Sequence, residues 1–199
     1  MRRSNPEKVM DPVRRYSQLL DEHSNLFSKL HEITGEVVRA AEVIIATLRT
    51  GNKILVCGNG GSASDAQHFA AELVGRFEKE RRALCAISLT TDTSLLTALG
   101  NDYGYDTVFS RQVEGIALSG DLLIGISTSG NSRNVILAVE SAKNRGVKSI
   151  GLLGRDGGAL ASCVDTPVIV SHPVTARIQE AHIFILHFWC ALIEDELFP

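Results

Sequence analysis

The chain has 199 residues, of which 44% are hydrophobic and 22% are charged, and its formal net charge is −3. This composition is ordinary for a soluble globular protein, and a chain of this length buries roughly 70% of its unfolded surface, so it needs no disulfide or metal to fold. The slight negative charge excludes the basic footprint that nucleic-acid binding usually leaves, and we expect no nucleic-acid partner.

Cysteine use and hydropathy indicate a cytoplasmic protein with no membrane partner. The four cysteines show no CxxC spacing, and three lie in apolar runs where cysteine packs as a small hydrophobe, so we expect reduced thiols in a reducing compartment. No apolar stretch follows Met1-Arg2-Arg3, so no signal peptide is expected. The apolar run at 183–193 is too short to cross a bilayer, which takes about 20 residues.

Residues 7–50 carry apolar side chains at helical spacing and predict two helices, with a break near Thr34-Gly35 and an end at Gly51-Asn52. We assign residues 1–50 as an N-terminal helical segment of the same domain as residues 51–199. Since the later residues already supply helices for both faces of a sheet, the apolar stripes of this segment are surplus. Surplus apolar surface indicates an association site, so we place the segment at an oligomer interface.

From residue 53 the pattern alternates between strands and helices. The apolar runs of strand length are 53–57, 84–89, 121–126, 148–153 and 167–170. The helix-like stretches are 63–76, 93–99, 107–118, 132–145, 157–162 and 176–197. Nearly continuous apolar strands that alternate with helices predict an α/β fold of the flavodoxin-like kind, in which helices flank a five-stranded parallel sheet.

A glycine-rich loop follows the first predicted strand, with Asn59, Gly60 and Ser62 as candidate phosphate-binding residues. Glycines let the backbone turn sharply and approach a ligand, and Ser62 or Ser64 is expected to cap the next helix, whose N-terminus attracts anions. The loop has neither the Gly-Lys-Ser/Thr of a P-loop nor the G-x-G-x-x-G spacing of dinucleotide sites. A plain tight turn with a capped helix fits equally well, so this loop alone does not decide.

A second loop, which follows the third predicted strand, carries a stronger signal. Four hydroxyls occur within six residues: Ser127, Thr128, Ser129 and Ser132. The carboxyl ends of strands are where open α/β sheets bind ligands, and hydroxyls with backbone amides can surround a phosphate without a lysine. A serine- and threonine-rich turn that merely caps a helix needs only one such hydroxyl, so the pattern predicts phosphate binding.

Acid–base chemistry has candidates on two predicted helices. His68 and Glu72 are four residues apart and share a helical face that Arg76 extends, although such a pair is more often a solvated surface pair. His187 lies among large apolar side chains on the last helix, where a lone histidine is more often a core residue than a catalyst. From helical geometry alone, Glu180 is its better-placed partner, since Gln179 lies about 80° around the helix.

Four segments together resemble a known family. GNGGSASDAQHFAAEL, TALGNDYGYDTVFSRQV, GDLLIGISTSGNSRNV and ARIQEAHIFILH are similar to the sugar isomerase (SIS) domain, and specifically to bacterial phosphoheptose isomerases. The resemblance is strong over residues 45–199 and looser before them. It implies conversion of sedoheptulose 7-phosphate to D-glycero-D-manno-heptose 7-phosphate through a cis-enediol, the first step of ADP- and GDP-heptose synthesis for lipopolysaccharide and other surface glycans.

The resemblance also implies roles for individual residues. It assigns the phosphate to Ser62, Ser127, Thr128, Ser129 and Ser132, and the acid–base chemistry to Glu72 and His187. It implies one zinc ion per subunit with His68, Glu72, Gln179 and His187 as ligands, so it prefers Gln179 to Glu180. Arg76 and Asp102 match further active-site positions. Ala176 departs from the acidic residue of some members, which leaves the contacts to the sugar hydroxyls there less certain.

Assembly and rival functions complete the sequence-based picture. The resemblance implies a homotetramer with shared sites. Gln179 and His187, about 12 Å apart along one helix, meet a single ligand only against another helix, which we expect to come from a neighbouring chain. One rival is a non-catalytic SIS protein that binds the replication initiator. The ending Glu196-Leu197-Phe198-Pro199 also resembles that SIS protein, but the SIS protein lacks the histidine of the last helix. A second rival is an SIS enzyme with another phosphosugar substrate.

Overall fold

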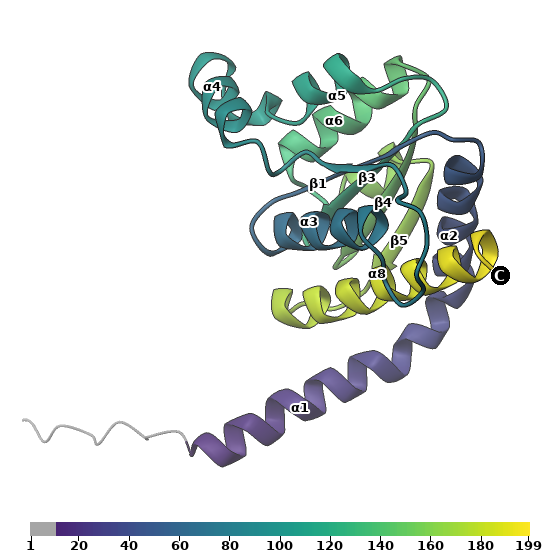
Figure 1. Ribbon diagram of the computed structural model, residues 1–199. Coiled ribbons are helices and arrows are strands. Elements are labelled where there is room, and N and C mark those ends of the chain that lie inside the picture. The colour runs from purple at the N-terminus through teal and green to yellow at the C-terminus, as the bar shows by residue number, and fades with distance from the viewer. Residues whose placement is uncertain (1–10) are drawn as a thin grey trace, which may run out of the picture.

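A five-stranded parallel sheet forms the centre of the computed structural model, which describes residues 11–199 (Figure 1). The strands are β1 (Ile54–Gly58), β2 (Ala86–Ser88), β3 (Leu122–Ser127), β4 (Lys148–Gly154) and β5 (Thr166–Val170). Their order in the sheet is β2-β1-β3-β4-β5, and every neighbouring pair is parallel. The predicted α/β fold and all five strands are confirmed, although β2 is only three residues long.

Helices connect the strands and cover the sheet. They are α1 (Pro12–Lys29), α2 (Thr34–Arg49), α3 (Gly61–Val74), α4 (Thr93–Tyr103), α5 (Ser110–Ile116), α6 (Arg133–Asn144), α7 (Leu160–Cys163) and α8 (Thr175–Leu197). Short 3-10 helices lie at η1 (Leu30–Ile33) and η2 (Tyr105–Thr107). Among residues 11–199, no helix is both long and apolar enough to cross a membrane.

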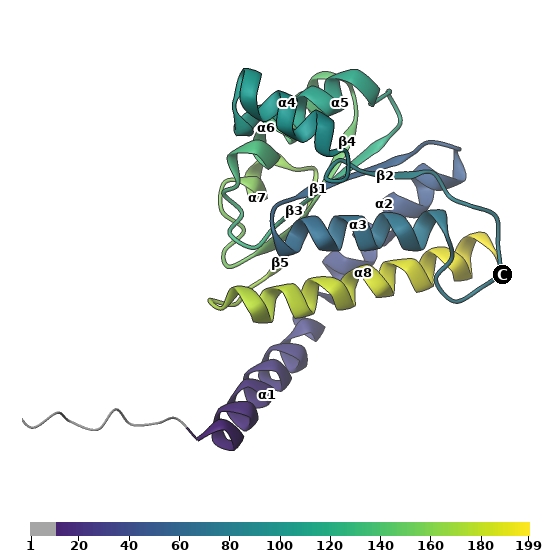
Figure 2. The same cartoon turned by 60° about the vertical axis from the view of Figure 1, so that its left-hand side comes forward.

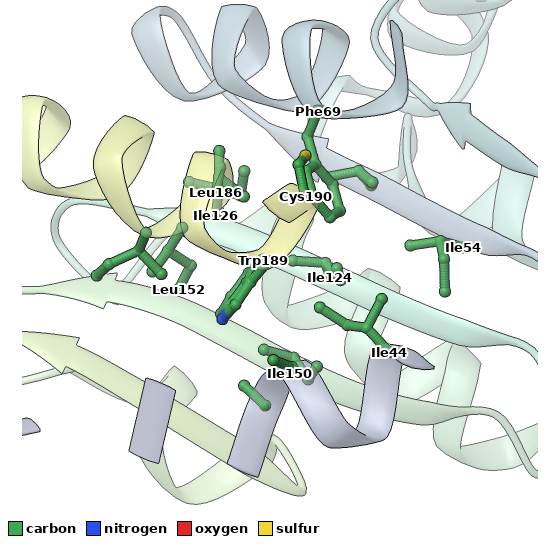
Figure 3. Packing of buried hydrophobic residues seen from close by; sticks show 14 of the residues in the cluster. Ile44, Ile54, Phe69, Ile124, Ile126, Ile150, Leu152, Leu186, Trp189 and Cys190 are labelled. Carbon is green, nitrogen blue, oxygen red and sulfur yellow. The ribbon is translucent and has the colours of Figure 1, made fainter. Parts of the chain in front are cut away.

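Each face of the sheet packs against its own set of helices because the strands are apolar on both sides. Helices α2, α3 and α8 share one core cluster with the strands, whereas α5, α6 and α7 share the other. Trp189 of α8 lies at the centre of the first cluster, where its ring meets Phe69 of α3 edge-on at 6.1 Å between centroids (Figure 3). Its indole Nε1 donates a hydrogen bond to the carbonyl of Val37 on α2, so this one side chain joins three elements.

The N-terminal segment divides into a buried part and an exposed part. The apolar stripe of α2 belongs to the core, so the expectation that all apolar surface of this segment is surplus is wrong for α2. Helix α1 instead extends away from the sheet (Figure 2), and Val13, Tyr16 and Leu20 are 73%, 70% and 52% exposed. The helix break lies at η1, just before the predicted Thr34-Gly35, and the predicted helical residues 7–10 lie outside the described residues.

The topology brings the two predicted phosphate loops together. Strands β1 and β3 are hydrogen-bonded neighbours, and Gly58 at the end of β1 is in register with Ile126 near the end of β3. Both loops therefore leave the same edge of the sheet side by side. Helix α3, which follows the first loop, lies alongside the final helix α8 (Figures 1 and 2).

Candidate functional site

The loop after β3 gathers its hydroxyls around Ser127. The Ser127 hydroxyl lies 2.9 Å from that of Ser132 and 3.5 Å from that of Ser129, and it accepts a hydrogen bond from the Gly130 amide at 3.1 Å. Ser132 is the N-cap residue of α6, but its side chain does not cap the helix. Because the hydroxyl that would cap α6 faces the loop instead, the N-terminus of α6 remains suited to an anion. The phosphate-binding role of these residues and of Thr128 stays a prediction.

Close packing fixes the shape of this loop. Gly130 has a φ of +67°, and a Cβ atom at this position would lie 2.0 Å from the carbonyl oxygen of Gly157. The Leu160 amide donates to the Gly130 carbonyl, and the Ala159 amide donates to the Asn131 side chain. The fold itself thus holds the loop against the turn that follows β4.

The glycine-rich loop after β1 differs from expectation at its helix start. Helix α3 begins at Gly61 with Gly60 as its N-cap, so Ser62 and Ser64 lie in the first turn and neither caps the helix. The reason is the positive φ of Gly60, which lets the chain turn earlier than the serines suggest. Asn59 exchanges two side-chain hydrogen bonds of 2.9 Å with Asn134 of α6, which joins the two loops.

The candidate acid–base residues lie where α3 faces α8. His68 Nε2 is 3.4 Å from the Glu72 carboxylate and 2.8 Å from Nε2 of His187, a residue 119 positions away in the sequence. The His68–Glu72 pair therefore faces another helix, although the His68 side chain remains 42% exposed. His187 is only partly buried, so it is not the core histidine that its apolar neighbours suggest.

The core histidine of α8 is His182. Its side chain is fully buried, and Nε2 lies 3.1 Å from the carbonyl oxygen of Leu153 at the end of β4. Burial lowers the pKa of His182 to about 4, although the hydrogen bond to Leu153 acts in the opposite direction. The imidazole is therefore neutral at physiological pH and ties α8 to the sheet.

Glu180 and Gln179 face different helices. Glu180 accepts a hydrogen bond from Arg177 at 2.5 Å and lies 2.8 Å from His23 of α1. Gln179 instead lies against α3: its side-chain amide nitrogen is so close to Gly61 that a Cβ atom at Gly61 would lie 2.2 Å from it. The choice of Glu180 from helical geometry is thus wrong. The neighbours of α8 change along its length, so residues on nearly the same face of this helix meet different partners.

Gln179 and His187 both face one helix, and that helix is α3 of the same chain. Gln179 lies beside Gly61 at the start of α3, and His187 lies beside His68 two turns later. A neighbouring chain is therefore not needed to bring a helix between these two residues, contrary to our expectation from their spacing.

Two further predicted residues pair with neighbours outside the His68–Glu72–His187 cluster. Helix α3 ends at Val74, so Arg76 does not extend its face, and the exposed Arg76 guanidinium pairs with Glu80 at 3.7 Å. Asp102 is exposed near the end of α4, where it accepts a hydrogen bond from Asn101 at 2.8 Å. Both views separate α4 from α8 (Figures 1 and 2), so the single chain does not bring Asp102 to His187.

Metal ligation is not evident from the side-chain positions alone. Two imidazole nitrogens and a carboxylate, which are donor types that zinc accepts, converge at His68, Glu72 and His187. Within residues 11–199, however, no group of three or more His, Cys, Asp or Glu side chains is arranged to hold a metal ion. The four-ligand zinc site stays a prediction.

Sequence reasoning missed a buried ion pair beside the site. Arg81 and Glu194 are 2.9 Å apart, with side chains only 1% and 2% exposed. The one signal in the sequence is that Glu194 follows the apolar Ala191-Leu192-Ile193, where a carboxylate on a buried face needs a partner. Arg81 gives no such signal, since it belongs to a charged stretch that is typical of exposed segments.

Comparisons with known proteins show what the chain as a whole is similar to. A sequence profile described as "SIS domain" matches residues 18–154. The chain is 58% identical to a phosphoheptose isomerase of Geobacter sulfurreducens, and the match covers 84% of this chain and 89% of the relative. It is 52% identical to the phosphoheptose isomerase of Geobacter metallireducens, and that match covers 96% of this chain and 98% of the relative. It also superposes on the phosphoheptose isomerase structures of Neisseria gonorrhoeae (TM-score 0.88, 48% identity, 93% and 100% coverage) and Francisella tularensis (TM-score 0.90, 36% identity, 94% and 100% coverage).

Proposed function

Because this chain belongs to the SIS-domain family and to the phosphoheptose isomerases within it, we propose that it converts sedoheptulose 7-phosphate to D-glycero-D-manno-heptose 7-phosphate. The observation that carries the proposal is the contact of α3 with α8, which joins Glu72, His68 and His187 through distances of 3.4 and 2.8 Å. A ketose–aldose isomerase needs a base and an acid at one place, and this contact supplies a carboxylate and imidazoles.

The hydroxyl loop and the α3–α8 contact take different parts of the reaction. The loop at Ser127 holds the phosphate, together with Asn59 and Gly60 of the neighbouring loop. Glu72 removes a proton from C1 of the open-chain ketose and returns it to C2 by way of a cis-enediol. His187 acts as the partner acid and base, which protonates the enediol oxygen or assists ring opening. A carboxylate and an imidazole suit these roles near neutral pH.

A zinc ion is part of the proposal, with one ion per subunit held by His68, Glu72, Gln179 and His187. His68, Glu72 and His187 supply donor types that zinc accepts, although within residues 11–199 they are not arranged to hold a metal ion and an amide oxygen such as that of Gln179 is an uncommon zinc ligand. Zinc would polarise the substrate carbonyl as a Lewis acid or order the site. The proton transfers described above rest on the side chains alone.

We further propose a cytoplasmic homotetramer that supplies heptose for surface glycans such as lipopolysaccharide. The exposed apolar side chains of α1 support self-association. An apolar hollow of ≈ 260 Å³ beside α1 supports it as well, since its walls are formed mainly by Phe27, Leu30, Ile33, Val37, Phe184 and Phe188. A second copy of the chain would cover both surfaces.

The deciding experiment is incubation of the purified protein with sedoheptulose 7-phosphate, followed by analysis of the products. We expect D-glycero-D-manno-heptose 7-phosphate to accumulate to an equilibrium ratio that is also reached from the product side. If no substrate is consumed although the protein binds the replication initiator, the non-catalytic alternative holds. If other phosphosugars are turned over and the heptose is not, the substrate assignment is wrong.

A further inference from the structure

The segment between α3 and β2 is held in place by a carboxylate from the far end of the chain. Both oxygens of Glu194, on the last turn of α8, accept hydrogen bonds from consecutive backbone amides: Phe77 at 2.9 Å, Glu78 at 2.9 Å and Lys79 at 2.7 Å. Arg81 donates a fourth bond through Nε at 2.9 Å. A buried carboxylate with four donors is fully satisfied, so this part of the segment has a single well-defined position.

Arg81 extends this anchor to the end of α3. Its guanidinium donates to the carbonyl oxygen of Glu72 at 2.7 Å and to that of Leu73 at 2.9 Å, with a longer contact of 3.4 Å to Gly75. These carbonyls belong to the last turn of the helix, where the backbone has no partners of its own. One buried ion pair thus fixes both the turn that carries Glu72 and the segment that follows it.

The anchored segment contacts the candidate acid–base residue His187 through Phe77. The Phe77 ring packs on the imidazole of His187, with 5.4 Å between ring centroids and 32° between ring planes. His68 is the other aromatic neighbour of His187, at 5.0 Å and 54°. The imidazole of His187 therefore contacts two rings: that of His68, which can donate or accept a proton, and that of Phe77, which can do neither.

We propose that Phe77 is a positioning residue, which is anchored through its backbone by Glu194 and Arg81 and which holds the His187 imidazole in the orientation needed for isomerisation. The inference rests on the proposed function, because His187 must act on the substrate for its orientation to matter. A partly buried histidine such as His187 can still adopt several side-chain rotamers. A flat apolar wall restricts this choice without adding a hydrogen bond that would compete for the imidazole proton.

The test compares two substitutions at Phe77. Phe77→Leu removes the ring while the residue stays apolar, and Phe77→Tyr keeps the ring. We expect Phe77→Leu to lower kcat by about tenfold or more, since small misplacements of a catalytic group are costly, with little change in KM because the phosphate loop is untouched. Phe77→Tyr should stay close to wild type. Phe109→Leu is the matched control, since Phe109 is buried in the core cluster on the opposite face of the sheet.

A spectroscopic readout makes the test independent of turnover. In protein labelled with 13C at histidine Cε1, the His187 signal should shift in Phe77→Leu, because the ring current of Phe77 is lost, and should be retained in Phe77→Tyr and Phe109→Leu. Glu194→Gln should reproduce both the fall in kcat and the shift. Combining it with Phe77→Leu should add little, as expected for residues that act in series. If Glu194→Gln does not fold, the Phe77 pair still decides.

The proposal is overturned if Phe77→Leu leaves kcat and the His187 signal unchanged. It is also overturned if Phe77→Tyr lowers kcat as much as Phe77→Leu does, since the ring would then not be what matters. An equal fall of kcat in Phe109→Leu overturns it as well, since the effect would then follow from lost stability. Failure of the proposed function is a different result. In that case the wild-type protein itself does not isomerise the heptose phosphate, whereas an active wild type with an unaffected Phe77→Leu rejects the positioning role alone.

Discussion

Replacing Glu72 by glutamine tests the centre of the proposed chemistry with little disturbance of the fold. The Glu72 side chain is 23% exposed, and its carboxylate lies 3.4 Å from Nε2 of His68. Its backbone is held independently, because Arg81 binds the Glu72 carbonyl. An amide has the shape of the carboxylate but cannot accept a proton from carbon. The variant should therefore fold and bind substrate normally while losing the base.

The size of the effect follows from the role assigned to the residue. A single positioned base contributes about 10²–10⁴ in rate, so kcat of Glu72→Gln should fall by this factor. At 1.36 kcal/mol for each tenfold change, the barrier rises by about 3–5 kcal/mol. KM should change little, since the hydroxyl loop at Ser127 lies on the sheet edge and makes no use of the Glu72 charge.

The assay is formation of the aldose phosphate, together with exchange of solvent deuterium into the substrate. Glu140→Gln on α6 is the matched control, because it makes the same chemical change at an exposed residue outside the site and should retain full activity. Circular dichroism and a calorimetric titration establish that Glu72→Gln is folded and binds substrate. If that variant keeps more than about a tenth of the wild-type kcat, Glu72 is not the base.

Four further predictions use other parts of the structure. Ser127→Ala combined with Ser129→Ala should weaken the binding of sugar phosphates and leave the melting temperature nearly unchanged. If a calorimetric titration gives the double variant the same affinity as the wild type, this loop does not bind the phosphate. Protein purified without chelators should contain zinc by elemental analysis, and metal-free protein with full activity would exclude an essential ion. Co-expressed Glu72→Gln and Asp102→Asn chains, each inactive alone, should form hybrids that regain activity. In Asp121, burial acts to raise the pKa, but hydrogen bonds and the charge of Lys53 outweigh it and lower the pKa below its ordinary value. The stability that this carboxylate supplies is thus present above its unfolded pKa of about 3.9 and is lost as pH falls below that value. Asp121→Asn should therefore lower the melting temperature at pH 7, and the melting temperature of the variant should fall less on acidification than that of the wild type.

The sheet was predictable because its signal is local and redundant. The central strands β1 and β3 are buried on both faces, which few structures other than a covered parallel sheet allow, and the structure has all five strands in the expected places. The hydroxyl loop was predictable for a related reason. Four hydroxyls at a strand end exceed what a helix cap requires, and the structure brings those of Ser129 and Ser132 to that of Ser127.

The contacts between helices were not predictable from spacing. Counting residues along α8 favours Glu180 as the partner of His187, yet Glu180 contacts His23 of α1 while Gln179 faces α3. Which neighbour a helical face meets depends on the packing of the whole domain, and this information is absent from the helix itself. The Arg81–Glu194 pair is hidden for the same reason, since its members are separated by 113 positions.

Asp102 gives the strongest structural reason to expect sites shared between chains. The resemblance assigns Asp102, Glu72 and His187 to one active site, but within a chain α4 is separated from the contact of α3 with α8 (Figure 1). Asp102 hydrogen-bonds Asn101 and not Glu72, His68 or His187 of its own chain, so either it has no role in catalysis or we expect it to act on a substrate bound by a neighbour. The exposed apolar side chains of α1 and the hollow beside Phe184 provide the surface for such a neighbour. Glu72 and His187 are already joined within one chain through His68, so hybrids that separate those two residues should stay inactive, whereas hybrids that separate Glu72 from Asp102 should recover.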